Sequence, residues 1–130
     1  MEEIINKLVD IEKYVSEEKG GFSLFALFLR EDAPDVWDLL VSAPWIGKDR
    51  SSVLKYLTDV IHSRFAEKEL LKLSRIVIIE NDNPALQAIH RTVNTEHKNT
   101  EIIDCNFFGL DIKHAYLITS KKLESSETAA

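Results

Sequence analysis

Residues 75–84 read Arg-Ile-Val-Ile-Ile-Glu-Asn-Asp-Asn-Pro, an aliphatic run that passes directly into a helix start. The four consecutive β-branched residues at 76–79 predict a strand over 75–80. Asn83 is a favoured helix-cap residue and Pro84 suits the first helical position, so the sequence predicts a helix beginning at residue 84. A strand that leads at once into a helix is typical of an α/β fold.

Upstream of this unit, the sequence predicts a helix followed by two strands. Strands are predicted over 22–29 and 36–43, and the polar residues 30–35 between them favour an antiparallel hairpin. The first strand is apolar at nearly every position, which indicates that both of its faces are covered. The helix ends at Gly20-Gly21. Its apolar stripe could pack on its own sheet or on a second copy of the chain. The stripe contains Ile4, Leu8, Ile11 and Val15.

The remaining elements follow the same logic. Residues 44–47 break the second strand, and Asp49 or Ser51 is positioned to cap the helix after it. A short helix is predicted over 67–73. Strands predicted over 101–108 and 112–120 form a second hairpin around Gly109-Leu110-Asp111. The apolar residues at helical spacing in the helix after Asp49 are Val53, Leu57, Val60, Ile61 and Phe65.

The predicted fold is a single α/β domain over residues 1–120 with the element order α-β-β-α-β-α-β-β. Its five strands form one mixed sheet with the helices packed on it. The two strand–helix–strand connections predict that strands two, three and four are parallel. The order of the strands across the sheet is left open by this reasoning, and residues 121–130 are predicted to be a disordered tail.

Composition restricts the class of protein. The chain has 130 residues, 45% hydrophobic and 29% charged, which suits one globular domain. Its net charge of -6 disfavours nucleic acid and anionic membranes as partners. The charge is unevenly distributed, since residues 44–75 hold seven basic and four acidic side chains, whereas residues 76–111 hold two basic and six acidic ones.

Cysteine usage and the N-terminus indicate a compartment. Cys105 is the only cysteine, which excludes an internal disulfide and any Cys-x-x-Cys motif. The first residues are acidic and lack the charge pattern of a signal peptide. No apolar run approaches the roughly 20 residues that a membrane-spanning helix needs. We therefore expect a soluble cytoplasmic protein without a membrane partner.

A ligand site is expected at the carboxyl ends of the parallel strands, where ligands bind in open α/β sheets. Strand two leads into Trp45, Lys48 and Arg50, beside a helix N-terminus that attracts anions. Strand three leads into Asp82. We predict these four residues as the ligand-binding set, with capping and ordinary solvated charges as the alternative reading.

Carboxylates at this edge also suggest a metal site. Glu80 and Asp82, joined by Asp38 or Asp104 from neighbouring strands, offer the oxygen ligands that Mg²⁺ prefers. The alternative is a strand-to-helix turn in which Asp82 and Asn83 cap the following helix. The two interpretations differ in whether the four carboxylates converge.

Two functions remain open at this point. The absence of a complete catalytic motif favours a binding or regulatory module without a cofactor, which associates with itself or with another protein. Apolar surface on the first helix and in the Trp45 loop supports self-association. The alternative is a Mg²⁺-dependent hydrolase of phosphate esters that uses the carboxylates named above. It includes nuclease-like activity, since Pro34-Asp35 and Asp111-Ile112-Lys113 resemble a nuclease motif, although their spacing is far wider than in that motif. Whether the chain is an enzyme stays open.

Overall fold

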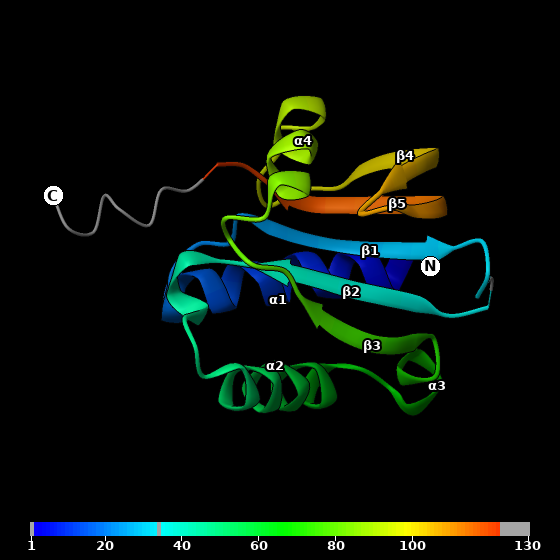
Figure 1. The fold of residues 1–130 in the computed structure, drawn as a ribbon. Coiled ribbons are helices and arrows are strands. Elements are labelled where there is room, and N and C mark those ends of the chain that lie inside the picture. The colour runs from blue at the N-terminus through cyan, green and yellow to red at the C-terminus, as the bar shows by residue number, and fades with distance from the viewer. Residues whose placement is uncertain (1, 34, 123–130) are drawn as a thin grey trace, which may run out of the picture.

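The computed structural model of the chain describes residues 2–33 and 35–122. Four α-helices, one 3₁₀ helix and five strands are found in this part of the chain, and the α/β fold class is confirmed (Figure 1). In chain order they are α1 (Glu2–Lys19), β1 (Leu24–Arg30), β2 (Trp37–Ser42), η1 (Pro44–Ile46), α2 (Arg50–Arg64), α3 (Glu67–Leu70), β3 (Leu73–Ile78), α4 (Pro84–Thr92), β4 (Thr100–Phe107) and β5 (Leu110–Ser120).

The strands form one sheet in the order β3-β2-β1-β5-β4. Both predicted hairpins are present, since β1 pairs antiparallel with β2 and β4 pairs antiparallel with β5. The predicted parallel pairing of strands two and three is also found. The prediction that strand four is parallel to them is wrong. β5 is antiparallel to β1, and therefore β4 runs opposite to β2 and β3.

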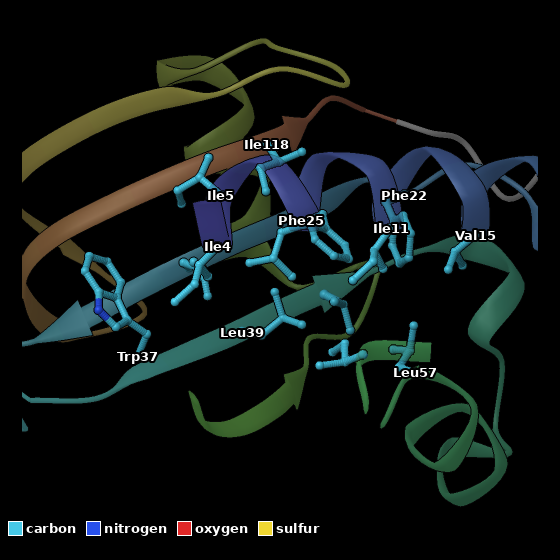
Figure 2. Close-up of a cluster of buried hydrophobic side chains, with 14 of the residues drawn as sticks. Ile4, Ile5, Ile11, Val15, Phe22, Phe25, Trp37, Leu39, Leu57 and Ile118 are labelled. Carbon is cyan, nitrogen blue, oxygen red and sulfur yellow. The ribbon is translucent and has the colours of Figure 1, made fainter. Parts of the chain in front are cut away.

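Helices cover the two faces of the sheet unequally. α1 and α2 pack on one face, where their side chains join those of β1 and β2 in the larger hydrophobic cluster (Figure 2). The apolar stripe of α1 lies wholly within this cluster, so it packs on its own sheet. The surplus apolar surface on α1, from which self-association was predicted, is therefore internal.

α4 covers the opposite face. Leu86 and Ile89 pack there against Leu24, Ala26 and Leu117. Side chains of β1 thus enter both clusters, which confirms the prediction that both faces of this strand are covered. α4 also carries the chain from the β3 edge of the sheet to the β4 edge, which explains why the usual rule for parallel crossovers does not apply to β4.

Two helix starts follow their predicted capping chemistry. The Asp49 side chain accepts a hydrogen bond from the backbone N–H of Ser52 at 3.3 Å, so Asp49 rather than Ser51 caps α2. The Asn83 side chain accepts from the N–H of Ala85 at 2.8 Å, with Pro84 at the first position of α4. Each cap supplies a partner for an N–H group that the first helical turn leaves unpaired.

Gly20 ends α1 in a conformation that side chains disfavour, with φ of 120°. A Cβ atom at this position would lie 3.1 Å from Cδ1 of Trp45. Trp45 in turn packs edge-on against Phe22, with ring centroids 5.6 Å apart. The close approach of the Gly20 backbone therefore seats the Trp45 ring on the core.

We expect Gly20→Ala to lower the free energy of unfolding by about 1–3 kcal/mol, the usual cost of one strained backbone position, with a further loss from the displaced indole. Gly109→Ala is a suitable control, because Gly109 also has a positive φ, of 74°, but a Cβ added there would have no atom within 4 Å. Urea unfolding measures both. An equal loss in the two variants would show that the Trp45 contact is unimportant.

One carboxylate joins α1 to α2. Glu18 accepts hydrogen bonds from the hydroxyl of Tyr14 at 3.1 Å and from the hydroxyl of Tyr56 at 2.9 Å. Burial and the Glu18 hydrogen bond raise the pKa of Tyr56 to about 12. The hydrogen bond that the Tyr14 hydroxyl donates to Glu18 likewise raises the pKa of Tyr14, and burial raises the pKa of Tyr116.

These shifts predict the alkaline behaviour of the protein. The chain has three tyrosines, and the pKa of each lies above its ordinary value of 10.0 in the folded state. Because a raised folded-state pKa disfavours ionisation of the native protein, stability should fall as the pH rises from 10 toward 12. Tyrosinate absorbance should be weaker for native protein at pH 10 than for the same protein in urea. Equal ionisation of the tyrosines in the two states at pH 10 would contradict these contacts.

The first residue of the predicted tail is part of the fold. Lys121 belongs to the ordered fold, since its N–H donates to the carbonyl of Ser23 at 3.1 Å and its ammonium pairs with Glu96. The rest of the predicted tail, residues 123–130, lies outside the described residues.

Candidate binding pocket at the carboxyl ends of the parallel strands

The chain leaves two neighbouring parallel strands in opposite directions. β2 leads through η1 to α2 on one face of the sheet, and β3 leads to α4 on the other face. A crevice opens where adjacent parallel strands diverge in this way, and ligands of open α/β sheets bind in such crevices. The fold therefore creates a topological switch point at the ends of β2 and β3.

A pocket with a volume of about 210 Å³ lies at this switch point. Its lining combines aliphatic side chains with charged and amide ones. We call it the switch pocket, and it is lined by Ala43, Pro44, Ile46, Gly47, Arg50, Ile78, Ile79, Glu80, Asn81 and Asp82. Predicted site residues Arg50, Glu80 and Asp82 are thus brought together.

The pocket lining contains three charged side chains, of which two pair with each other. The guanidinium of Arg50 forms an ion pair with the carboxylate of Glu80. Asp82 is exposed and takes part in no ion pair with any of the residues 2–33 and 35–122. The Asp49 carboxylate is occupied as the cap of α2. Asp82 is consequently the one charged side chain of the pocket lining without an ion-pair partner among residues 2–33 and 35–122.

The other two predicted ligand residues lie beside the pocket. Trp45 is half-buried and packs on the core, and it lines a neighbouring depression with Lys19, Asp49 and Tyr56. Lys48 is exposed in the turn before α2. Neither residue lines the switch pocket.

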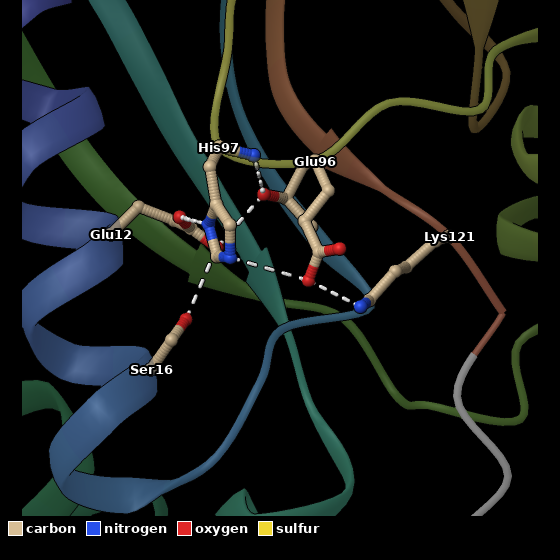
Figure 3. A network of polar contacts seen from close by, with 6 residues as sticks. Glu12, Ser16, Glu96, His97 and Lys121 are labelled. Atoms are coloured by element: carbon tan, nitrogen blue, oxygen red, sulfur yellow. Dashed lines mark hydrogen bonds and ion pairs between the residues drawn. The ribbon is translucent and has the colours of Figure 1, made fainter.

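A polar network that sequence reasoning missed lies at the same end of the sheet (Figure 3). Glu12 of α1 is fully buried and contacts Nδ1 of His97. Its other carboxylate oxygen accepts hydrogen bonds from the hydroxyl of Thr119 at 2.8 Å and of Ser16 at 3.2 Å. Three polar side chains therefore surround this buried carboxyl group, as a buried polar group requires.

The loop that carries His97 is tied down on both sides. His97 has φ of 57°, an uncommon value for a residue with a side chain. Its N–H donates to the hydroxyl of Thr119 at 3.2 Å, and its Nε2 lies 3.3 Å from the carboxylate of Glu96. Glu96 pairs with Lys121, and this hydrogen bond lowers the pKa of Glu96. The network therefore joins α1, the loop over 95–98 and the end of β5.

One signal for this network was present in the sequence. Glu12 follows Leu8 by four residues and so lies on the buried stripe of α1. A carboxylate on an apolar stripe needs a partner, but His97 is 85 residues away. Only the folded chain shows which residue supplies that partner.

The four carboxylates proposed for a metal site do not converge. Asp38 pairs with Arg75 in the β2–β3 register, and Glu80 lies five residues further along, which is about 16 Å at 3.3 Å per residue. Asp104 lies on β4, four strand spacings or about 19 Å from β3. No cluster of three or more His, Cys, Asp or Glu residues suited to a metal ion is found within residues 2–33 and 35–122.

Asp38 and Asp104 have local roles of their own. Asp38 is buried and its Oδ2 lies 3.0 Å from Nε of Arg30 and 3.3 Å from the guanidinium of Arg75. Asp104 has φ of 52° and is exposed on β4, between Ile103, which pairs with His114, and Cys105, which pairs with Ile112. Burial, together with the Asp104 charge, raises the pKa of the Cys105 thiol, which keeps that thiol protonated rather than nucleophilic.

Comparisons with known proteins assign no family. No protein-family model, no curated protein and no solved structure matches the chain. No helix in the described part of the chain has the length and hydropathy needed to cross a membrane. The geometry of the site is therefore the basis on which a function can be proposed.

Proposed function

We propose that this chain is a small binding module that holds a cationic group, an ammonium or a guanidinium, in the switch pocket and that associates with itself. The carboxylate of Asp82, which has no ion-pair partner among the described residues and shares the pocket lining with Ile46 and Ile78, supports this proposal most strongly. Aliphatic side chains suit the methylene stem of a lysine or of a linear amine, and the carboxylate suits its charged end.

Pocket size supports the same class of ligand. Sites for drug-sized ligands span roughly 300–1,000 Å³, whereas the switch pocket holds about 210 Å³. A single long side chain or a small amine fits this volume, and a nucleotide does not. The dispersed carboxylates give the alternative, a Mg²⁺-dependent phosphate-ester hydrolase, no comparable support.

Calorimetric titration tests the proposal. One probe is a tripeptide with blocked ends and a central lysine, and its control has norleucine in place of lysine. We expect the lysine peptide to bind and the norleucine peptide not to bind. A linear diamine, added separately, distinguishes a free amine from a protein side chain as the source of the cationic group.

Asp82→Asn should weaken binding of the lysine peptide about ten-fold, which corresponds to about 1.4 kcal/mol. Asp59→Asn on the exposed side of α2 makes the same change in charge away from the pocket and should have no effect. Binding of Mg²⁺ alone that both Glu80→Gln and Asp82→Asn abolish would instead support the hydrolase. Binding of inorganic phosphate at the pocket would contradict a cationic ligand.

A further inference from the structure

One ion pair joins the two segments that line the switch pocket. Arg50 is the first residue of α2, and its guanidinium pairs with the carboxylate of Glu80, which follows β3. Both residues line the pocket, Arg50 at the end of the segment that leaves β2 and Glu80 within the segment that leaves β3. A cation that belongs to the chain is therefore already bound to one carboxylate of the pocket lining.

Both members of this ion pair are exposed. The Arg50 side chain has 43% of its surface exposed, and the Glu80 side chain has 66%. By contrast, Asp38, which pairs with Arg30 and Arg75, has only 5% exposed. An ion pair between exposed side chains contributes little, because water solvates both charges when they separate. A cation of a ligand can therefore replace Arg50 at Glu80 at small cost.

We propose that Arg50 competes with the cationic ligand for Glu80 and so sets the charge of the ligand that the switch pocket favours. The inference rests on the proposed function, because it concerns ligand binding in the same pocket. While Arg50 pairs with Glu80, Asp82 supplies the remaining carboxylate of the pocket lining, which suits a ligand with one cationic group. A ligand with two cationic groups needs both carboxylates, and Arg50 therefore disfavours it more strongly.

Repulsion between Arg50 and any nearby cation is the alternative cause of weaker binding. Repulsion acts whether or not residue 80 carries a charge, whereas competition requires the carboxylate of Glu80. The two causes therefore differ in the effect of removing Arg50 once residue 80 is neutral. A double-mutant cycle between Arg50 and Glu80 measures this difference.

Calorimetric titration in about 0.1 M salt tests the competition. One probe is the blocked lysine tripeptide, with one cationic group, and the other is the linear diamine, with two. Arg50→Gln should bind the tripeptide about two-fold and the diamine about five-fold more tightly than wild type, because the diamine gains a second exposed ion pair. Arg50→Gln/Glu80→Gln should bind both probes as wild type does, since Asp82 is again the available carboxylate.

Arg64→Gln is the matched control, because it makes the same substitution at an exposed residue of the same helix. Arg64 lies 14 residues, or about 21 Å, along α2 from Arg50. Charges more than about 10 Å apart are largely screened at this salt concentration, so both affinities should equal those of wild type.

The outcomes separate this inference from the proposed function. Equal affinities of wild type and Arg50→Gln for the diamine would overturn the competition, and so would a gain that persists in the double variant. In either case, binding of the lysine tripeptide by wild type would leave the proposed function standing. Absence of binding of both probes to wild type and to Arg50→Gln would end both.

Discussion

Leu8→Ala should lower the free energy of unfolding by about 2–5 kcal/mol, the usual cost of truncating a buried leucine. Leu8 is fully buried in the cluster that α1 forms with the sheet. Its removal leaves a cavity that the rigid surroundings fill only in part, so the loss includes both transfer and cavity terms. Denaturant unfolding measures the change directly.

The Leu8→Ala variant also tests whether α1 packs on its own sheet or at an interface between two copies of the chain. Because Leu8 contacts its own sheet, the loss relative to wild type should be equal at low and high protein concentration. A loss that grows with protein concentration would place α1 at an interface between copies and would contradict the observed packing. Leu71→Ala, at a residue with 77% of its surface exposed, is the control and should change stability by no more than about 0.5 kcal/mol.

His97→Ala should lower the free energy of unfolding by about 2 kcal/mol. The variant removes one of the three partners of the buried Glu12 carboxylate, and a buried charge that loses a partner costs about 1–3 kcal/mol or more. We place the value below the 3–5 kcal/mol of a fully buried pair, because 37% of the His97 side chain is exposed.

The paired variant Glu12→Gln/His97→Ala tests the cause of that loss. A glutamine at position 12 keeps an acceptor for the hydroxyls of Ser16 and Thr119 but carries no charge. The double variant should therefore be more stable than His97→Ala alone. Equal stabilities of the two variants would show that His97→Ala loses stability through a change in the loop over 95–98 rather than through the buried carboxylate of Glu12. His62→Ala, exposed on α2, is the control.

Local chemistry in the sequence was sufficient to place most elements. The Asn83-Pro84 pair marks the start of α4 because its cap acts within three residues. Turn residues likewise define both hairpins, and at the second of them Phe108 and Gly109 have φ of 57° and 74°, as a two-residue turn between antiparallel strands requires. Signals of this kind do not depend on distant parts of the chain.

Sheet order and strand direction depend on long-range packing instead. The aliphatic run of β3 indicated a strand correctly, but not that it would lie at the edge of the sheet. The crossover rule predicted a parallel β4 because it assumes that the helix returns the chain to a neighbouring position. α4 instead crosses to the other edge, where β4 pairs with β5.

The sequence predicted three residues of the candidate site correctly and grouped two others with them wrongly. Arg50, Glu80 and Asp82 follow the ends of adjacent strands, and the general rule for α/β sheets brought them together. Asp38 and Asp104 were grouped with them from residue type alone. Asp38 instead bonds Arg30 and Arg75 near the start of β2, a pairing that becomes evident only from the register of three strands.

Amide chemical shifts recorded during titration with the blocked lysine tripeptide test most directly whether the switch pocket is the binding site. We predict saturable changes concentrated at residues 43–50 and 78–82, absent with the norleucine peptide and reduced in Asp82→Asn. Changes centred instead on the Glu12–His97 network, or none at millimolar peptide, would contradict the proposed site.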